Sequence, residues 1–149
     1  MNMSFSCRKT VSEHVDVSVI MPVYNESPEY VMSAIQSVLH QKDFVDEFII
    51  CDDGAGEDTR RILEKLRLEG KIHLLCNRGK KGASGARNRA IEYASGRYIA
   101  LMDADDVSGP ERIRKEYEFL EKNTKYSFVG AKGELFEKNR ETGKRSIGL

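Results

Sequence analysis

The chain has 149 residues, of which 40% are hydrophobic, so it has the length and apolar content of one folded domain rather than of a disordered segment. Its 24 basic and 24 acidic residues give a formal net charge of zero, which argues against non-specific nucleic-acid binding because that binding needs a basic surface. The chain has no apolar run near the roughly 18 residues of a membrane span, and its three cysteines, Cys7, Cys51 and Cys76, form no CxxC pair, which favours a reducing compartment.

Residues 1–15 are polar and lack the apolar core of a secretory signal, so they are predicted to form a flexible arm. We therefore expect a cytoplasmic protein, and an association with the inner face of the membrane stays open. Beyond the arm, Val17–Met21 is predicted to be a strand that Pro22 ends. Ser27 and Pro28 then have the cap and first-turn pattern of a helix start. The apolar face of that helix comprises Val31, Ala34, Ile35, Val38 and Leu39.

Strands and helices continue to alternate along the chain. Further strands are predicted at Glu47–Cys51, Ile72–Leu75, Tyr98–Met102 and Tyr126–Val129. Further helices are predicted over about 58–68, between 86 and 95, and after Ser108, where Glu111 is placed for a capping box. This repetition predicts an α/β fold over residues 16–135, with a Rossmann-like, mostly parallel sheet flanked by helices. Residues 136–149 form a charged tail without a predicted element.

Three of the predicted strands run into polar or acidic sequences. The first is followed by Pro22-Val23-Tyr24-Asn25-Glu26, the second by Asp52-Asp53-Gly54 and the fourth by Asp103-Ala104-Asp105-Asp106. Because the carboxyl ends of parallel strands lie at one edge of a sheet, five or more carboxylates are expected in one crevice. Their mutual repulsion would raise their pKa values unless a cation or strong donors lie between them.

Carboxylate oxygens without neighbouring His or Cys pairs favour a hard cation, Mg²⁺ or Mn²⁺. If the chain stays extended past Met102, Asp103 and Asp105 point to the same side and can hold one metal ion. A diphosphate would then lie between that ion and a basic segment, and Tyr24 offers an aromatic face for a base. The basic segment comprises Arg78, Lys80, Lys81, Arg87 and Arg89.

Each of these signals is weak alone, because Asp-Asp-Gly is common turn chemistry and lysine pairs are usually solvated. Their order is more specific. The segments VSVIMPVYNE, IICDDG, GASGARNRAI and GRYIALMDADD, together with Pro110-Glu111-Arg112, resemble the family 2 glycosyltransferases, an inverting group with the GT-A fold, over roughly residues 16–130. The resemblance implies transfer of a sugar from a nucleotide-sugar, usually a UDP-sugar, to a glycan or lipid-linked acceptor, with a divalent metal.

The resemblance also implies roles for single residues. Pro22, Tyr24 and Glu26 match the lip of the base and ribose pocket, Asp53 with Asp52 matches the group that reads uracil, and Gly82, Arg87 and Asn88 match the segment beside the donor. Asp103 and Asp105 match the D-x-D motif, with Asp105 as the direct metal ligand and Asp103 nearer the ribose or donor sugar.

Two departures from the family pattern stand out. Ala55 follows Asp52-Asp53-Gly54 where the family commonly has Ser, and the acceptor-binding half with its general base has no match; Glu137 and Glu141 lie in no recognisable context. We therefore expect the donor-binding portion of a longer enzyme, which can form a homodimer through an exposed apolar face. The alternatives are a nucleotidyltransferase, which the sequence after the first strand disfavours, and a nucleotide-sugar-binding module without catalysis.

Overall fold

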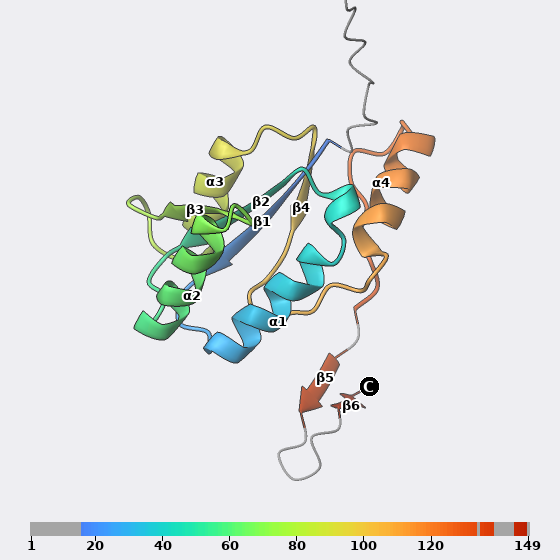
Figure 1. Ribbon diagram of the computed structural model, residues 1–149. Coiled ribbons are helices and arrows are strands. Elements are labelled where there is room, and N and C mark those ends of the chain that lie inside the picture. Colours follow the sequence, from blue (N-terminus) through green and yellow to red (C-terminus); the bar gives the residue numbers. More distant parts are fainter. Residues whose placement is uncertain (1–15, 134, 139–144, 149) are drawn as a thin grey trace, which may run out of the picture.

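The computed structural model describes residues 16–133, 135–138 and 145–148. The arm predicted over residues 1–15 and Glu141 lie outside these ranges. A parallel sheet with the strand order β3-β2-β1-β4 forms the centre of the fold, and helices cover both of its faces (Figure 1). The elements are β1 (Val17–Val23), α1 (Pro28–Leu39), the 3₁₀ helix η1 (Lys42–Phe44), β2 (Glu47–Asp52), α2 (Glu57–Leu68), β3 (His73–Cys76), α3 (Ala83–Tyr93), β4 (Tyr98–Leu101), α4 (Arg112–Lys122), β5 (Leu135–Lys138) and β6 (Arg145–Gly148).

The two faces of the sheet bury different side chains. Alternate residues of β1 point to opposite faces, so Val19 and Met21 join one core, whereas Ile20 joins the other. The larger core packs the sheet against α1, α2 and the start of α4. The smaller core packs it against α3, whose Ala86 and Ala90 allow a close approach. The predicted α/β class with a parallel sheet is therefore confirmed.

A polar network fixes the amino-terminal edge of the sheet. The Glu47 carboxylate accepts hydrogen bonds from Ser18 Oγ (2.6 Å), Ser95 N (2.9 Å) and Ser95 Oγ (2.6 Å), and Ser18 Oγ accepts one from Gly96 N (2.9 Å). A Cβ on Gly96 would lie 2.6 Å from Ser18 Oγ, so the loop before β4 needs glycine there. Burial opposes ionisation of Glu47, but these donors outweigh it and keep its pKa below the usual value.

Three predicted elements differ from the structure. β1 continues through Pro22 to Val23, because proline removes only its own N–H and Val23 O still accepts from Asp53 N (2.8 Å). The charged tail contains β5 and β6, which pair antiparallel, so the expected boundary between residues 135 and 136 falls inside β5.

The third difference is the strand predicted at Tyr126–Val129, which does not form. Tyr126 N donates to Asn123 O (3.0 Å) in a turn after α4, and the Tyr126 ring stacks on Phe119. This turn keeps the segment beside β4 without a strand ladder, and the Phe128 side chain is 85% exposed. Ile99 and Leu101 of β4 are exposed too. The homodimer expected from such apolar surface stays a prediction.

Candidate functional site

Three chain segments meet at the carboxyl edge of the sheet. β1 lies between β2 and β4, with Val23 opposite Asp52 and Ile20 opposite Leu101. All three strands are parallel, so the segments that follow them leave the sheet on the same side. This arrangement is the one that the sequence predicts.

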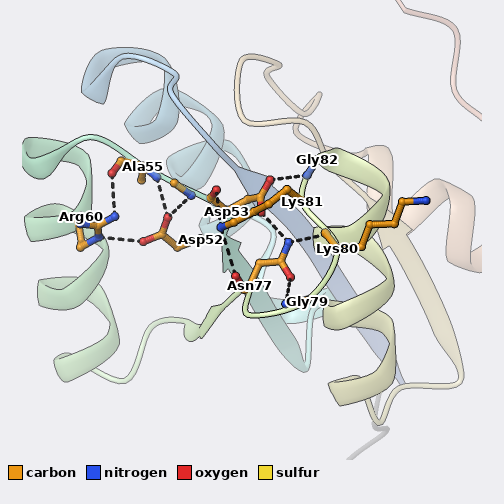
Figure 2. A network of polar contacts seen from close by, with 10 residues as sticks. Asp52, Asp53, Ala55, Arg60, Asn77, Gly79, Lys80, Lys81 and Gly82 are labelled. Carbon is orange, nitrogen blue, oxygen red and sulfur yellow. Dashed lines mark hydrogen bonds and ion pairs between the residues drawn. The ribbon is translucent and has the colours of Figure 1, made fainter.

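Asp52 shapes the turn between β2 and α2. Its Oδ1 atom accepts hydrogen bonds from Gly54 N (2.8 Å) and Ala55 N (2.7 Å). Its Oδ2 atom accepts one from Arg60 Nε (3.0 Å), and Figure 2 shows Asp52 between Ala55 and Arg60. Burial raises the pKa of the Asp52 carboxyl, but the two backbone donors and Arg60 lower it more, so the net pKa lies below the usual value. The ionised side chain therefore stabilises the turn itself.

The lowered pKa of Asp52 predicts a pH-dependent contribution to stability. The unfolded pKa of an aspartate is about 3.9, so the contribution is complete above that value and is lost as the pH falls through the lower pKa of the folded state. We expect Asp52→Asn to lower the free energy of unfolding by about 2 kcal/mol near neutral pH, with the difference shrinking toward about pH 3. Urea unfolding at both pH values, with the exposed Asp58→Asn as control, measures this. An equal penalty at both pH values would contradict the assignment.

Asp53 is 4% exposed and ties the loop after β3 to the end of β2. Its Oδ1 atom accepts a hydrogen bond from Asn77 Nδ2 (2.6 Å), and its Oδ2 atom accepts one from Gly82 N (2.7 Å) (Figure 2). Lys81 Nζ lies 3.5 Å from Oδ1 and donates to the backbone oxygens of Asp53 and Asn77. Burial opposes ionisation, but the bonds from Gly82 and Asn77 and the charge of Lys81 keep the pKa of Asp53 below its usual value.

Asn77 is the residue of this network that sequence reasoning missed. Its buried amide also donates to Lys80 O (3.0 Å) and accepts from Gly79 N (3.1 Å), so one side chain organises the whole loop. Glycine permits the fold of the loop at two places. Gly82 has φ +100°, and a Cβ on Gly85 would lie 1.8 Å from Lys80 O. The signal in the sequence was an asparagine directly after a strand, which tolerates turn geometry and bonds to nearby backbone.

Residues 103–106, which we call the acidic turn, follow β4. A chain that stays extended past Met102 was the condition considered from the sequence. The chain instead forms a turn, in which Asp106 N donates to Asp103 O (3.2 Å). The buried side chains of Met102 and Ala104 enter the larger core, whereas Asp103 and Asp105 remain exposed. The three aspartates are exposed. Burial, followed by the charges of Asp105 and Asp103, raises the pKa of Asp106.

Arg87 of α3 reaches the acidic turn and forms an ion pair with Asp103. The Arg87 Nε atom is buried and has no hydrogen-bond partner among the residues that the structure describes. The structure thus brings together two residues that the sequence analysis assigned to the donor site. Protein donors also lie against the carboxylates of Asp52, Asp53 and Asp103.

The segment after β1 completes this edge. Glu26 accepts a hydrogen bond from Tyr24 N (2.7 Å) through its carboxylate, and its carbonyl accepts one from Thr59 Oγ1 (3.3 Å). The Tyr24 side chain is 61% exposed. Gly54 has φ +135°, and a Cβ there would lie 3.1 Å from the Tyr24 ring. Glycine at position 54 therefore leaves room for the ring at the mouth of the site.

The chemistry of the acidic turn fits a hard divalent cation, because its exposed donors are all carboxylate oxygens. Within residues 16–133, 135–138 and 145–148, no three His, Cys, Asp or Glu side chains are grouped closely enough to form a complete metal site. Asp105 makes no hydrogen bond or ion pair with another described residue. A cation at Asp105 would therefore need further ligands from water or phosphate, which is how Mg²⁺ is commonly bound.

The family model described as "Glycosyl transferase family 2" matches residues 18–147. The chain belongs to that family. A relative from Escherichia coli, the UDP-Glc:alpha-D-GlcNAc-diphosphoundecaprenol beta-1,3-glucosyltransferase WfgD, is 41% identical over 130 residues, which cover 86% of this chain and 49% of the relative. The S. aureus TarS 1-349 structure in complex with UDP is 28% identical, with a TM-score of 0.60, and the match covers 73% of this chain and 33% of the TarS 1-349 chain.

PcManGT, a mannosyltransferase from Pyrobaculum calidifontis, was solved in complex with GDP-Man and Mn2+. Its match to this chain has a TM-score of 0.61 at 21% identity and covers 70% of this chain and 32% of the PcManGT chain, so the two share the fold. These family 2 relatives and the GT-A likeness confirm the family resemblance and the expected fold. The chain spans about half the length of WfgD and a third of the TarS chain. In the part of the family 2 chain that the structure describes, no helix combines the length and the apolar character needed to cross a membrane.

Proposed function

We propose that this chain is the donor-binding part of a glycosyltransferase that uses a UDP-sugar and a divalent cation, Mn²⁺ or Mg²⁺. The observation that carries the proposal is the convergence, at the carboxyl edge of one parallel sheet, of an exposed aromatic ring, the Asp53 network and the acidic turn. WfgD is named for a UDP-glucose donor, and TarS was solved with UDP, which supports uridine as the base. The sugar would pass with inversion to a glycan or lipid-linked acceptor.

Each side chain of the edge has a distinct task in this proposal. Tyr24 stacks on the uracil with its exposed ring, while Pro22 and Glu26 support the lip beside it. Asp105 and Asp103 would hold the cation, which would supply a Lewis acid for the charge on the leaving diphosphate. Arg87, already paired with Asp103, places a guanidinium beside the same diphosphate.

A contact between Asp53 and the uracil edge has a structural condition. Both carboxylate oxygens already accept strong hydrogen bonds, from Asn77 Nδ2 and Gly82 N, and the side chain is buried. A uracil donor would therefore have to reach a lone pair that these two bonds leave unused. Asp53 therefore joins two tasks, because it holds the loop that precedes α3 and offers its remaining lone pairs to the base.

Calorimetric titration of UDP into the chain, first with Mn²⁺ and then with EDTA, tests this proposal. We expect saturable binding that requires the cation, because the exposed carboxylates repel a diphosphate when no cation is present. Titration of GDP under the same conditions is the matched control for the base. Absence of UDP binding in both conditions, or equal binding with and without the cation, would contradict the proposed donor site.

A further inference from the structure

A buried glutamine lies directly after α1, outside the donor site as described so far. Gln41 is 4% exposed, yet its amide is fully engaged. The Nε2 atom donates to Ser37 O (3.0 Å) and to Ser108 Oγ (3.0 Å), and the Oε1 atom accepts from Ile113 N (3.0 Å). A buried amide with both its donors and its acceptor used has one preferred orientation, so this side chain is fixed in place.

Two of the three partners of Gln41 lie beyond the acidic turn, since Ser108 belongs to the segment that joins this turn to α4 and Ile113 to the first turn of α4. Ser108 is bound a second time, because its N–H donates to Ser37 Oγ (2.9 Å). We call Ser37, Gln41, Ser108 and Ile113 the α1 clamp. The clamp also explains why the capping box predicted at Ser108 is absent. The hydroxyl of Ser108 is bound to Gln41, the Glu111 carboxylate is paired with Arg114 and Lys115, and α4 begins at Arg112 without a side-chain cap.

The acidic turn is thus held from both of its ends. On the β4 side, Met102 N donates to Ile20 O (3.0 Å), and the side chains of Met102 and Ala104 are buried in the larger core. On the other side, the clamp fixes the chain from Ser108 to Ile113. Asp103 and Asp105, the candidate metal ligands, follow directly after Met102. Only Asp106 and Val107 lie between Asp105 and Ser108, where the clamp begins.

We propose that Gln41 is a positioning residue of the donor site, which sets the place of the acidic turn relative to β1 through Ser108 and Ile113. This inference rests on the proposed function. An apolar side chain could fill the same volume, but it would leave the Ile113 N–H and the Ser108 hydroxyl without their buried partner. The chain from Ser108 to Ile113 would then take a different position, and the carboxylates of the acidic turn would lose the arrangement that a cation needs.

The test compares Gln41→Met with Gln36→Met, since Gln36 is an exposed glutamine of α1, the helix that precedes Gln41, and serves as the matched control. Two quantities are measured at a temperature where all variants are folded. The first is the affinity for UDP with Mn²⁺, and also for Mn²⁺ alone. The second is the amide hydrogen exchange of Ile113 and Ser108, with Ile20 in β1 as the internal reference.

We expect Gln41→Met to bind UDP with Mn²⁺ about tenfold more weakly, the lower end of the loss seen when residues that orient metal ligands are removed. Exchange at Ile113 should accelerate while exchange at Ile20 stays unchanged, and Gln36→Met should match the wild type in both measurements. Ser108→Ala removes one bond of the clamp without emptying the Gln41 site, so it should show a smaller loss in the same direction. If Gln41→Met does not fold, the affinity and the hydrogen exchange of Ser108→Ala decide the test.

The outcomes separate this inference from the proposed function. A folded Gln41→Met, or Ser108→Ala in its place, that binds UDP with Mn²⁺ as tightly as the wild type would overturn the positioning role alone. A wild-type chain that binds neither UDP nor Mn²⁺ would overturn the proposed function together with the inference. A purely structural glutamine would lower the unfolding midpoint without changing the affinity of the folded chain.

Discussion

Asp105→Asn is expected to weaken Mn²⁺-dependent UDP binding by about 100-fold or more, because removal of a direct ligand should exceed the roughly 10–100-fold loss caused by removing an outer partner. Within the acidic turn, the structure favours Asp105 over Asp103 as the direct ligand. Asp103 is already neutralised by Arg87, whereas Asp105 is exposed and has no ion-pair partner in the described ranges. Calorimetric titration of UDP with Mn²⁺ measures the loss.

Asp58→Asn is the control for this prediction, since Asp58 is an exposed aspartate at the start of α2. It should bind UDP like the wild type, and both variants should unfold close to the wild-type midpoint, because both side chains are exposed and the surface ion pair of Asp58 with Arg61 contributes little. Undiminished, cation-dependent affinity in Asp105→Asn would move the metal site away from this residue, and Asp103 and Asp106 would then be substituted in the same assay.

Asp53→Ala is expected to lower the free energy of unfolding by about 3 kcal/mol, the largest stability effect that we predict. The substitution leaves Asn77 Nδ2 and Gly82 N without their acceptor in a buried place, and a buried unpaired donor costs on the order of 1–3 kcal/mol. The contribution of Lys81 is small because its side chain is mostly exposed and its charge is screened by solvent. Urea unfolding measures the change.

Asn77→Ala offers an internal check on the Asp53 result. The two side chains are bonded to each other, so their effects should not add, and the double variant should be clearly more stable than the sum of the single losses predicts. Asp58→Ala again controls for the loss of an aspartate. A loss below about 0.5 kcal/mol in Asp53→Ala, the range of ordinary surface substitutions, would show that the loop does not depend on this carboxylate.

The parallel sheet could be predicted because its signal is local. Val17–Val23 and Glu47–Asp52 are short β-branched runs, and the helices between them have a regular apolar face. The failures arose where contacts that the local pattern does not reveal, distant in one case and nearby in another, override that pattern. Ser108 fits a capping box by spacing, but Gln41, far away in the chain, takes its hydroxyl. Tyr126–Val129 has strand-like composition, but Tyr126 stacks on Phe119 and its N–H is bound in a turn at Asn123, so the segment forms no strand ladder.

The candidate site shows the same division. The acidic residues could be located from the sequence, because each follows a predictable strand. What neutralises them could not be predicted, since the partners of Asp53 include a backbone N–H, which any residue but proline carries, and an asparagine in a loop. The extended form considered for Asp103–Asp105 is replaced by a turn, in which Asp106 N donates to Asp103 O.

The strand order has a consequence for how the molecule folds. β1, β2 and β3 are neighbours both in sequence and in the sheet. β4 instead pairs with β1, which is far from it in sequence, on the edge of β1 opposite β2. Non-local pairings form later on average, because the entropy of closing a long loop must be overcome before any contact rewards it. The acidic turn follows β4 directly, so the nascent chain can build most of its sheet while the edge that would hold a charged ligand is still open.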